Sequence, residues 1–568
     1  MQEFADLVIV NASVHTMDPG EPDRISDAIA VKGGTIVGLG REEADHLAGP
    51  DTKVVDAAGG AVIPGINDAH LHFVSAAMAA FGYVRLDPAV APDWASVVEV
   101  INAAPAGEDG WIRAHGWDEV LLGTSSGNLL GCRPGTPVVA FDATGHQLLA
   151  NHEALNRAGI TAATSDVDGG VVERAADGTP TGLLQDGAME LLSRAMPPIP
   201  DSTLRPAVLQ LQEQLHMLGI TSLTEPGLGP ASAGLMDGAG STAALGLLAD
   251  LAAAGELTLR INVLMLFAGT GGANAAAISE GLRSGLAHSC TDRGIDPRQL
   301  RIAGVKIFAD GIPRSGTAWM SEPYGVACKH GSLVIQGASD DERVAELHRI
   351  VELIDHAGLQ AGVHATGDAA TSVAVQALMA AGRQAGSKAA SKGSGNRHYI
   401  IHGAFSDTGT LATMAANGIG YSTNPLIRQE AGDMMRGVLG EERFSRHQPL
   451  HSALEAGVHF NLASDAPVTS PDWRLTVVAA VRRATRSTPG APDDPERITG
   501  LQALAAMTSQ AAWQDHAEHF KGALVPGMAA DLCLLASPWP DDEEIEKLLE
   551  TDIRLTVSGG RVVHQSTT

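Results

Sequence analysis

The residues best suited to chemistry are four histidines and one aspartate that follow short apolar runs. His70 and His72 come just after the run Ala61–Ile66, in the string DAHLH at 68–72. Residues i and i+2 of a strand face the same side, so the two imidazoles are expected to project together. Two imidazoles on one face suit a first-row divalent metal ion. An isolated His-x-His pair is more often a surface feature than a metal site, so this pair needs further support.

Three more residues of metal-binding type supply that support. His364 ends an apolar run in VHATGD, His402 ends the next in IIHG, and Asp465 ends the last in LASDAP. Each alone reads as a capping or core polar group. Because the carboxyl ends of parallel strands meet at one rim, the five residues together predict a zinc-type site.

Lys306 is a sixth candidate, because it lies inside the apolar run IAGVKIF at 302–308. A charged ammonium in the middle of a buried strand is costly, so the amine must be neutral, paired or modified. The simplest alternative is an ion pair with a neighbouring carboxylate such as Asp310.

These residues need a scaffold, and the segment from Ala61 to about Pro467 provides one by alternating eight apolar runs with helical stretches. That alternation predicts an α/β fold, a (β/α)₈ TIM-type barrel with its active site at the carboxyl ends of the strands. A doubly wound sheet is the structural alternative, since periodicity does not distinguish closed from open sheets. The eight runs are Ala61–Ile66, Ile220–Leu223, Arg260–Leu266, Arg301–Phe308, Gln360–His364, Tyr399–His402, Gly420–Thr423 and His459–Leu462.

Two parts of the chain do not fit the alternation. Residues 1–60 and 522–568 are short β-type runs separated by Gly, Asp and Pro, and we expect both ends to form one small β-module. Residues 82–200 are rich in Gly and Pro and predict an inserted, substrate-side module after the first barrel strand. The barrel then comprises residues 61–81 and 201–521.

The composition excludes several classes of partner. The 568 residues carry a formal net charge of −28, which argues against nucleic acid and anionic membranes as partners. The four cysteines include no CxxC pair, which indicates free thiols in a reducing compartment. The sequence shows no signal peptide and no apolar run long enough to span a membrane, so a cytoplasmic location is expected. The sequence leaves open whether the chain forms a homo-oligomer.

With these motifs in place, the chain resembles the metal-dependent amidohydrolase superfamily, and within it the amidohydrolase family 3 branch that includes N-substituted formamide deformylases. The resemblance covers nearly the whole chain, and the order His-x-His, Lys, His, His, Asp is highly specific. The matching strings are VIPGINDAHLH (62–72), GHQLLANHEAL (145–155), DGTPTGLLQD (177–186), GVKIFADG (304–311), GVHATGD (362–368), IIHG (400–403), ASDAPV (463–468) and GALVPGMAADLCLL (522–535).

The resemblance implies a role for each of the six residues. His70 and His72 would bind the more buried metal, and His364 and His402 would bind a second. Lys306 would be carboxylated and bridge the two metals. Asp465 would contact the first metal and act as general base. The resemblance also implies the barrel, a β-sandwich made from both chain ends, and one or two Zn²⁺ ions, with Mn²⁺, Fe²⁺ or Co²⁺ as alternatives.

Two departures from the branch affect substrate contacts rather than metal binding. Ile401 stands where the branch usually carries Glu, and the run Thr366–Ala369 stands where relatives often read Ile-Gly-Asp-Arg. Candidate substrate contacts in this chain are His146, Trp117, Arg314 and Trp319. Tyr324 follows the fourth run with Arg314 and Trp319, where loops usually shape specificity. The residues of the insert support a fold role equally well, and these are His115, Trp117, Asp118, His146 and Asn151.

The expected function is hydrolysis of an amide-type C–N bond of a small molecule (an N-acyl, N-formyl or cyclic amide) by a metal-bound hydroxide. Asp465 would take the water proton and deliver it to the leaving nitrogen. The alternatives are a deaminase, an ester or lactone hydrolase, and a non-catalytic regulatory homologue. A phosphate-handling barrel enzyme would need a Gly-rich loop where this chain has Asn424-Pro425 and Ala466-Pro467.

Overall fold

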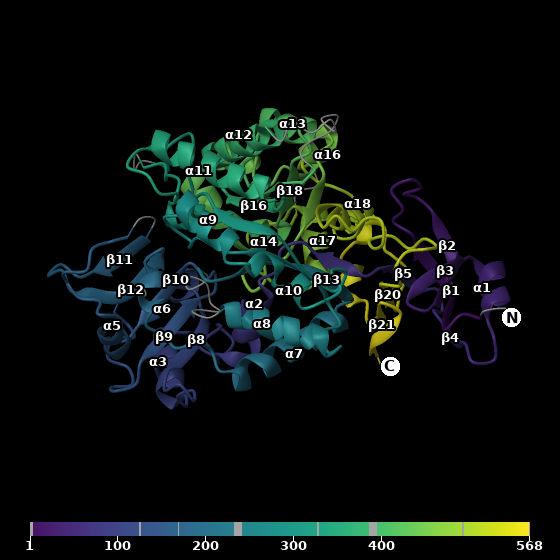
Figure 1. The fold of residues 1–568 in the computed structure, drawn as a ribbon, viewed down its shortest axis with the longest axis horizontal. Coiled ribbons are helices and arrows are strands. Elements are labelled where there is room, and N and C mark those ends of the chain that lie inside the picture. Colours follow the sequence, from purple (N-terminus) through teal and green to yellow (C-terminus); the bar gives the residue numbers. More distant parts are fainter. Residues whose placement is uncertain are drawn as a thin grey trace.

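The computed structural model describes residues 4–123, 127–167, 170–231, 241–325, 329–384, 395–490 and 493–566, and it contains three β-sheets (Figure 1). A parallel barrel sheet lies between the two others. The sheet formed by both chain ends lies on one side of it, and the sheet of the inserted segment lies on the other.

The barrel sheet has eight strands in sequential order, each parallel to its neighbours, as the sequence predicted. Nearly every strand residue is buried, which is why these strands read as continuous apolar runs rather than alternating patterns. The strands are β6 (Ile66–Asp68), β13 (Ile220–Leu228), β14 (Arg260–Met265), β15 (Leu300–Phe308), β16 (Gln360–Ala365), β17 (Tyr399–His402), β18 (Gly420–Thr423) and β19 (Phe460–Leu462).

The first and last strands meet through the segments that follow them. The backbone N–H of Asp465 donates to the carbonyl of His70 at 2.8 Å, and the N–H of His72 donates to the carbonyl of Ala466 at 2.9 Å. The Asp68 carboxylate also accepts the backbone N–H of Ser464 at 3.1 Å. The residues that join the two edges of the barrel sheet are therefore the ones that present candidate metal ligands.

The predicted first strand, Ala61–Ile66, is divided between two sheets. Residues Ala61–Pro64 form β5, which pairs with β1 and β20 in the terminal sheet. The barrel starts only at β6, after Gly65. An apolar run shows that a strand is buried but does not show in which sheet it lies, so this boundary was placed too early.

Helices surround the barrel, and most connect one strand to the next. In α7, Leu204, Val208, Leu211 and Leu215 recur at helical spacing and are buried against the barrel. None of the helices among the described residues is both long and apolar enough to cross a membrane. The main helices are α2 (Phe73–Ala77), α7 (Asp201–Met217), α8 (Ser241–Ala253), α9 (Ala275–Arg283), α11 (Asp340–His356), α12 (Asp368–Gln384), α13 (Thr408–Ala416), α14 (Pro425–Leu439), α15 (Glu441–Ser445), α16 (Leu450–Ala456), α17 (Trp473–Arg482), α18 (Gly500–Ala506) and α19 (Ser509–Gln514).

Polar side chains close the amino-terminal end of the barrel. Asn67 of β6 donates to the Asp515 carboxylate at 2.7 Å, Asn461 of β19 donates to Gln514 at 2.6 Å, and Arg301 of β15 donates to the Asp515 carbonyl at 2.6 Å. This network just after α19 ties three strands together at that end.

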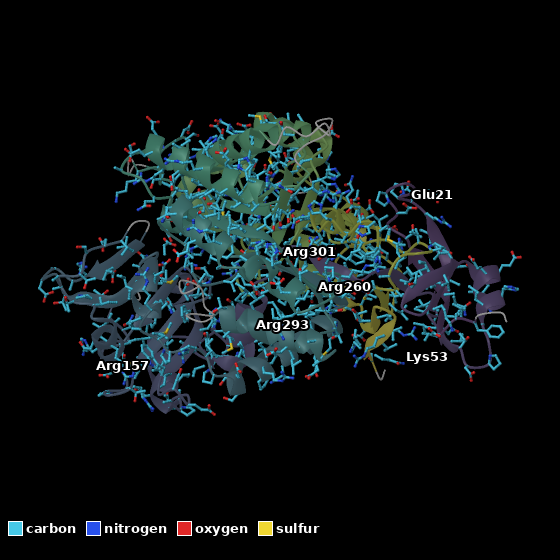
Figure 2. All side chains as sticks on the ribbon, in the orientation of Figure 1. Glu21, Lys53, Arg157, Arg260, Arg293 and Arg301 are labelled. Carbon is cyan, nitrogen blue, oxygen red and sulfur yellow. The ribbon has the colours of Figure 1, made fainter. Side chains whose placement is uncertain are left out.

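Strands from both ends of the chain lie in one mixed sheet. The ion pair between Arg260 Nε of β14 and Asp531 Oδ2, at 2.7 Å, links this sheet to the barrel where Figure 2 labels Arg260. Its packing as a two-layer sandwich stays a prediction. The sheet contains β1 (Leu7–His15), β2 (Ile25–Lys32), β3 (Thr35–Leu39), β4 (Lys53–Asp56), β5 (Ala61–Pro64), β20 (Leu532–Leu535), β21 (Ile553–Ser558) and β22 (Arg561–Gln565).

The segment between β6 and α7 forms its own six-stranded sheet with its own apolar core, built around Trp117, Ile112 and Val138. Its limits at residues 82 and 200 stay a prediction. The strands are β7 (Val84–Arg85), β8 (Ile112–Trp117), β9 (Val138–Asp142), β10 (Gln147–Ala150), β11 (Gly170–Arg174) and β12 (Pro180–Asp186), and the helices are α3 (Trp94–Ala103), α4 (Glu119–Leu122), α5 (His152–Ala158) and α6 (Met189–Ser193).

Candidate metal centre

His70 and His72 lie on the extended segment just past β6, and both point at Asp465. His70 Nε2 is 3.2 Å and His72 Nε2 is 3.5 Å from Asp465 Oδ1. The Asp68 carboxylate accepts the backbone N–H of His70 at 3.3 Å, so the residue that ends the strand also fixes the first histidine. The predicted convergence of the pair is present, although neither residue is inside the strand.

His364 and His402 face each other from neighbouring strands. His364 lies in β16, His402 ends β17, and their ring centroids are 4.7 Å apart. The Nδ1–H of His402 donates to Asn424 Oδ1 at 2.7 Å, which leaves Nε2 free to bind a metal. His364 Nε2 lies 3.3 Å from the Gly311 carbonyl, which leaves Nδ1 free in the same way.

The two pairs form one cluster. The ligand atoms of His70, His402 and Asp465 all lie within 4.8 Å of one another, and the three residues are buried. Lys306, only 1% exposed, lies inside β15, with Nζ 4.7 Å from the centroid of the Phe308 ring. Lys306 lines the same pocket as His70, His364 and His402, so the lysine belongs to this cluster.

Burial sets the charge state of this cluster. It holds the pKa of His70 and His364 well below the usual range and lowers that of His402 to about 4. Burial also lowers the pKa of Lys306 to about 7. For Asp465, burial raises the pKa, but hydrogen bonds from His70 and His72 outweigh it, and the pKa stays well below its usual value. Neutral imidazoles and an ionised carboxylate are the forms that bind metal ions.

The donor set fits a divalent ion. His70 Nε2 lies beside Asp465 Oδ1 only, and the Nδ1 atoms of His70 and His72 are buried and have no hydrogen-bond partner among the described residues. Buried polar atoms without partners are rare and costly, and a bound cation would satisfy those that face the cluster. The imidazole nitrogens and carboxylate oxygen are the ligand types that zinc prefers.

The backbone is strained at two candidate ligands. His402 has φ of 70° and Asp465 has φ of 59°, in the left-handed region that residues other than glycine adopt at a cost. Such conformations cluster at functional sites, where the surrounding structure holds them.

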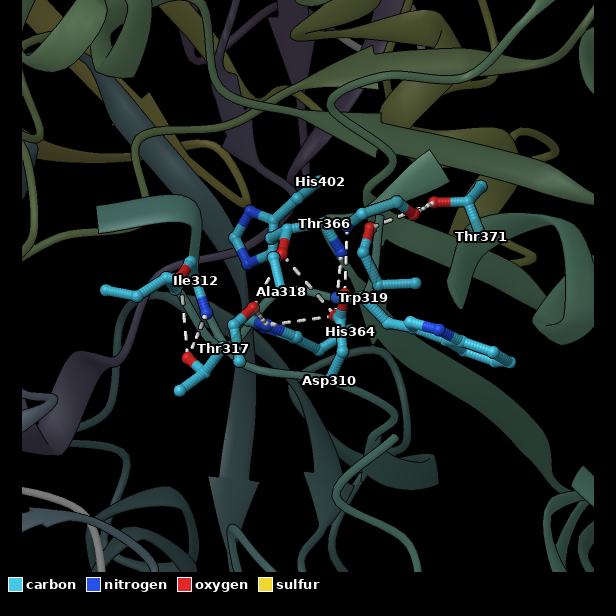
Figure 3. A network of polar contacts seen from close by, with 12 residues as sticks. Asp310, Ile312, Thr317, Ala318, Trp319, His364, Thr366, Thr371 and His402 are labelled. Carbon is cyan, nitrogen blue, oxygen red and sulfur yellow. Dashed lines mark hydrogen bonds and ion pairs between the residues drawn. The ribbon is translucent and has the colours of Figure 1, made fainter. Parts of the chain in front are cut away.

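Asp310 supports His364 from behind, as Figure 3 shows. Its carboxylate accepts the backbone N–H groups of Trp319, Thr366 and Gly367, each at 2.9 Å. The Thr366 hydroxyl donates to the Gly311 carbonyl at 2.6 Å, and that carbonyl contacts His364. Asp310 therefore fixes the loop after β15 against the end of β16, rather than making the ion pair with Lys306 that the sequence suggested. Burial raises its pKa to about 7, and the three backbone hydrogen bonds oppose that shift.

A pocket opens above the cluster, and the inserted segment forms one of its walls. His146 lines this pocket, as predicted, and donates from Nδ1 to Asp186 Oδ1 at 2.8 Å. Burial lowers the pKa of His146, but the Asp186 hydrogen bond and charge raise it above its usual value overall. The ring centroid of His146 is 6.4 Å from that of His364, so the insert places one more histidine beside the cluster.

The other candidate substrate residues have different positions. Trp117 is wrongly predicted: its ring is fully buried in the insert core, and its Nε1–H donates to the Ala140 carbonyl at 2.8 Å. Trp319 packs against the main core, and its backbone bonds Asp310. Arg314 lines the apolar extension of the pocket described below and is paired with Asp118 at 2.9 Å.

Of the remaining residues considered from the sequence, some have a structural role and others line a cleft. Asn151 caps α5 by accepting the N–H of Ala154, and the Tyr324 hydroxyl donates to the Ala318 carbonyl at 2.7 Å. Both are structural. His115 and Asp118 line a wider cleft between the insert and the barrel.

An apolar extension of the pocket was not predicted. It runs from the cluster along α14 and the loop after β15. The apolar wall consists of Ile312, Pro313, Ala404, Ile427, Ala431, Met434, Met435 and Val468.

Comparisons with known proteins agree with this geometry. The sequence pattern of the amidohydrolase family matches residues 53–564. Protein LONG AFTER FAR-RED 3 of Arabidopsis thaliana is 28% identical over 99% of this chain and 92% of its own length. The N-substituted formamide deformylase of Arthrobacter pascens is 28% identical over the full length of both chains. The crystal structure of a metal-dependent hydrolase from Pyrococcus horikoshii shares the fold, with a TM-score of 0.71 and 21% identity over 98% of this chain and 100% of that one.

Proposed function

Because this chain belongs to the amidohydrolase family, we propose that it is a metal-dependent hydrolase that cleaves an amide-type C–N bond of a small molecule. A Zn²⁺ ion is the proposed cofactor, with Mn²⁺, Fe²⁺ or Co²⁺ as substitutes and room for one or two ions. The residues that would hold it are His70, His72, Lys306, His364, His402 and Asp465.

One observation carries this proposal: four neutral imidazoles and an ionised carboxylate converge at the floor of a single pocket. A structural role alone would favour fully hydrogen-bonded histidines, yet the Nδ1 atoms of both His70 and His72 are buried without partners among the described residues. The same arrangement argues against a homologue that kept the fold but lost its chemistry.

A divalent ion bound there would acidify water and polarise the substrate carbonyl. Asp465 would accept the proton of the attacking water and return it to the leaving nitrogen, because its carboxylate stays ionised and faces the ligand atoms of His70 and His72. His146, which is held by Asp186 and lines the same pocket, would donate a hydrogen bond to the substrate carbonyl.

The apolar extension of the pocket supports an uncharged amide with an apolar substituent. Aliphatic and methionine side chains dominate that wall, and the Arg314 charge is balanced by Asp118. The relative named N-substituted formamide deformylase supports the same bond class.

The test combines metal analysis with a panel of substrates. We expect one or two equivalents of a divalent metal in the purified protein, and hydrolysis of N-formyl, N-acyl or cyclic amides that chelation abolishes and Zn²⁺ restores. His70→Ala should lose metal and turnover together, whereas His451→Ala, at an exposed histidine on α16, should keep both.

Matched esters, lactones and aminopurines in the same panel separate the alternatives. Faster turnover of these compounds would replace the amide with an ester or a deaminase substrate. Full activity in a metal-free preparation would contradict the proposal entirely, and a metal-loaded protein without turnover would favour a non-catalytic role.

A further inference from the structure

Two buried polar residues stand in the otherwise apolar extension of the pocket. His447 and Gln448 lie between α15 and α16, and they are 1% and 2% exposed. Both line the pocket that also contains His364, His402 and Asp465. Neither residue belongs to the proposed metal centre.

The hydrogen-bonding capacity of the His447 ring is unused. Its ring lies beside Phe405 and is stacked on Phe444, with centroid distances of 5.1 and 5.8 Å. Neither ring nitrogen has a hydrogen-bond partner among the described residues. Since a neutral imidazole has one donor and one acceptor nitrogen, His447 can offer one of each to a ligand.

Two arginines fix His447 and keep it neutral. Arg483 Nη2 donates to the His447 carbonyl at 2.6 Å, and Arg428 Nη1 donates to the same oxygen at 3.3 Å. Burial, together with these two positive charges, holds the pKa of His447 well below its usual value. The backbone is therefore anchored on the side of the arginines while the ring contributes to the pocket wall.

Gln448 supplies a second unused acceptor. It has φ of 56°, and its backbone N–H donates to the Ala404 carbonyl at 2.7 Å. Its side-chain Nε2–H donates to the backbone carbonyl of Asn424, the residue that orients His402. That bond leaves Oε1 as an acceptor, and Oε1 is buried without a partner among the described residues.

Leaving such groups unpaired is costly, so a binding pocket that keeps them is suited to a ligand that pairs with them. A hydroxyl or carboxamide can donate to Gln448 Oε1 and also exchange a hydrogen bond with His447. A carboxylate has no donor for Gln448, and an ammonium would approach two guanidinium groups.

We propose that His447 and Gln448 recognise a neutral hydrogen-bonding group, a hydroxyl or a carboxamide, at the end of the substrate's apolar substituent. This inference rests on the proposed amide hydrolysis, since it names the substrate class of the same pocket. The apolar wall would pack against the substituent, and the two polar residues would hydrogen-bond to the group at its end.

The test compares matched substrates on the metal-loaded wild-type protein. The probes are the formamide of 2-phenylethylamine and its 4-hydroxy, 4-carbamoyl and 4-carboxylate derivatives. We expect kcat/KM to be roughly 10- to 100-fold higher for the hydroxy or carbamoyl compound than for the parent, and no such gain for the carboxylate. Equal kcat/KM for all four would overturn the inference while leaving amide hydrolysis intact.

A variant then assigns the preference to these residues. His447→Phe should reduce the ratio of kcat/KM for the hydroxy or carbamoyl compound to kcat/KM for the parent to less than about threefold, with unchanged metal content. His451→Ala should retain the wild-type ratio. His447→Leu, checked by thermal unfolding, serves if the phenylalanine does not fit. If no formamide is hydrolysed, the proposed function has failed, and the inference is tested by calorimetric binding of the four compounds instead. Tighter binding of the hydroxy compound that is lost in His447→Phe supports the inference. Equal binding of all four compounds overturns it.

Discussion

Asp465 shows most directly how one side chain can serve two purposes. Its Oδ1 atom lies 3.2 Å from His70 Nε2, and its carboxylate is fully ionised at neutral pH because hydrogen bonds from His70 and His72 lower its pKa more than burial raises it. Because it stays ionised, this carboxylate has an oxygen free to accept a proton from water, as a general base must. The positive φ at this residue shows that the fold accepts strain to direct the carboxylate there.

We therefore expect Asp465→Asn to fold normally and to lose about 10²–10⁴-fold in turnover, because the amide has the same shape but shuttles no proton. Initial rates on an amide substrate, circular dichroism and metal content should be measured on the same preparation. Near-normal turnover in a folded, metal-loaded variant would remove Asp465 from the proton transfer.

Lys306 is the second residue whose chemistry depends on burial. Burial lowers its pKa to about 7, so a large fraction of the amine is neutral near neutral pH. A neutral amine can add to CO₂ and release a proton, and the carbamate that forms is an anion suited to a site for cations. We predict that Lys306 is carboxylated, as the family resemblance implies.

Lys306→Ala should then lose metal and activity, and a short carboxylic acid supplied with metal should restore part of the activity. Carbon-13 NMR after incubation with labelled bicarbonate should show a carbamate signal in the wild-type protein that is absent in the variant. An active, metal-replete protein without that signal would rule the modification out.

At this scale the sequence identified the candidate ligands but not the residues that orient them. Each of the five His and Asp residues follows an apolar run, and that pattern is readable without a structure. Asn424 and Thr366 stand at strand ends too, but amides and hydroxyls are common there, so nothing marked them as partners of His402 and Gly311. Trp117 was misassigned because an aromatic residue near polar ones reads equally as a core or a pocket residue.

At the scale of elements, the passage from the terminal sheet into the barrel depends on Gly65. β5 ends at Pro64 and β6 begins at Ile66, and the N–H of Gly65 donates to the Asp531 carbonyl at 2.9 Å. A Cβ atom at Gly65 would lie 2.2 Å from Thr221 Oγ1 of β13. The chain passes closely enough to the second barrel strand that only glycine fits without a shift.

Gly65→Ala should therefore lower the free energy of unfolding by about 1–3 kcal/mol, the usual cost of overpacking. Gly437→Ala is the matched control, because a Cβ atom there meets nothing within 4 Å and alanine favours the helix α14. Chemical denaturation of both variants measures the difference. Equal stability of Gly65→Ala and wild type would show that Thr221 yields at no cost.

The number of barrel strands was predictable because each buried parallel strand gives its own apolar run. The closure of the barrel was not predictable, because residues about 400 positions apart make it by backbone hydrogen bonds. These residues, such as His70 and Asp465, lie beyond the strand ends. Short-range periodicity contains no information about such pairs.

At the scale of the whole molecule, a few buried contacts hold the terminal sheet against the barrel. His216, on α7, is 3% exposed and links the barrel to the terminal sheet. Its Nδ1–H donates to the Ile220 carbonyl at 3.0 Å at the start of β13, and Nε2 lies 2.8 Å from the Thr258 hydroxyl. Its backbone carbonyl accepts the Thr556 hydroxyl of β21 at 2.7 Å. These contacts give His216 a structural role between α7, β13 and β21.

The stability of the molecule should therefore fall with acid in a way that His216 controls. Burial lowers its pKa from 6.5 to about 4 in the folded chain. Between those values the unfolded state binds the proton and the folded state does not. The stability that depends on a neutral His216 is thus fully present above about pH 6.5. It is lost as the pH falls toward about 4, at roughly 1.4 kcal/mol per pH unit.

Denaturant unfolding of the chelator-treated protein at pH 6.5, 5.5 and 4.5 measures this dependence without a contribution from bound metal. The same series on His216→Met isolates the one histidine, because other buried groups titrate in both proteins. We expect the variant to be less stable at pH 6.5 but to lose stability less steeply, by about one proton in the slope, because methionine does not titrate. If stability falls equally steeply with pH in both proteins, the pKa of His216 is not lowered in the folded chain. His216 is then protonated without loss of the contacts between α7, the barrel and β21.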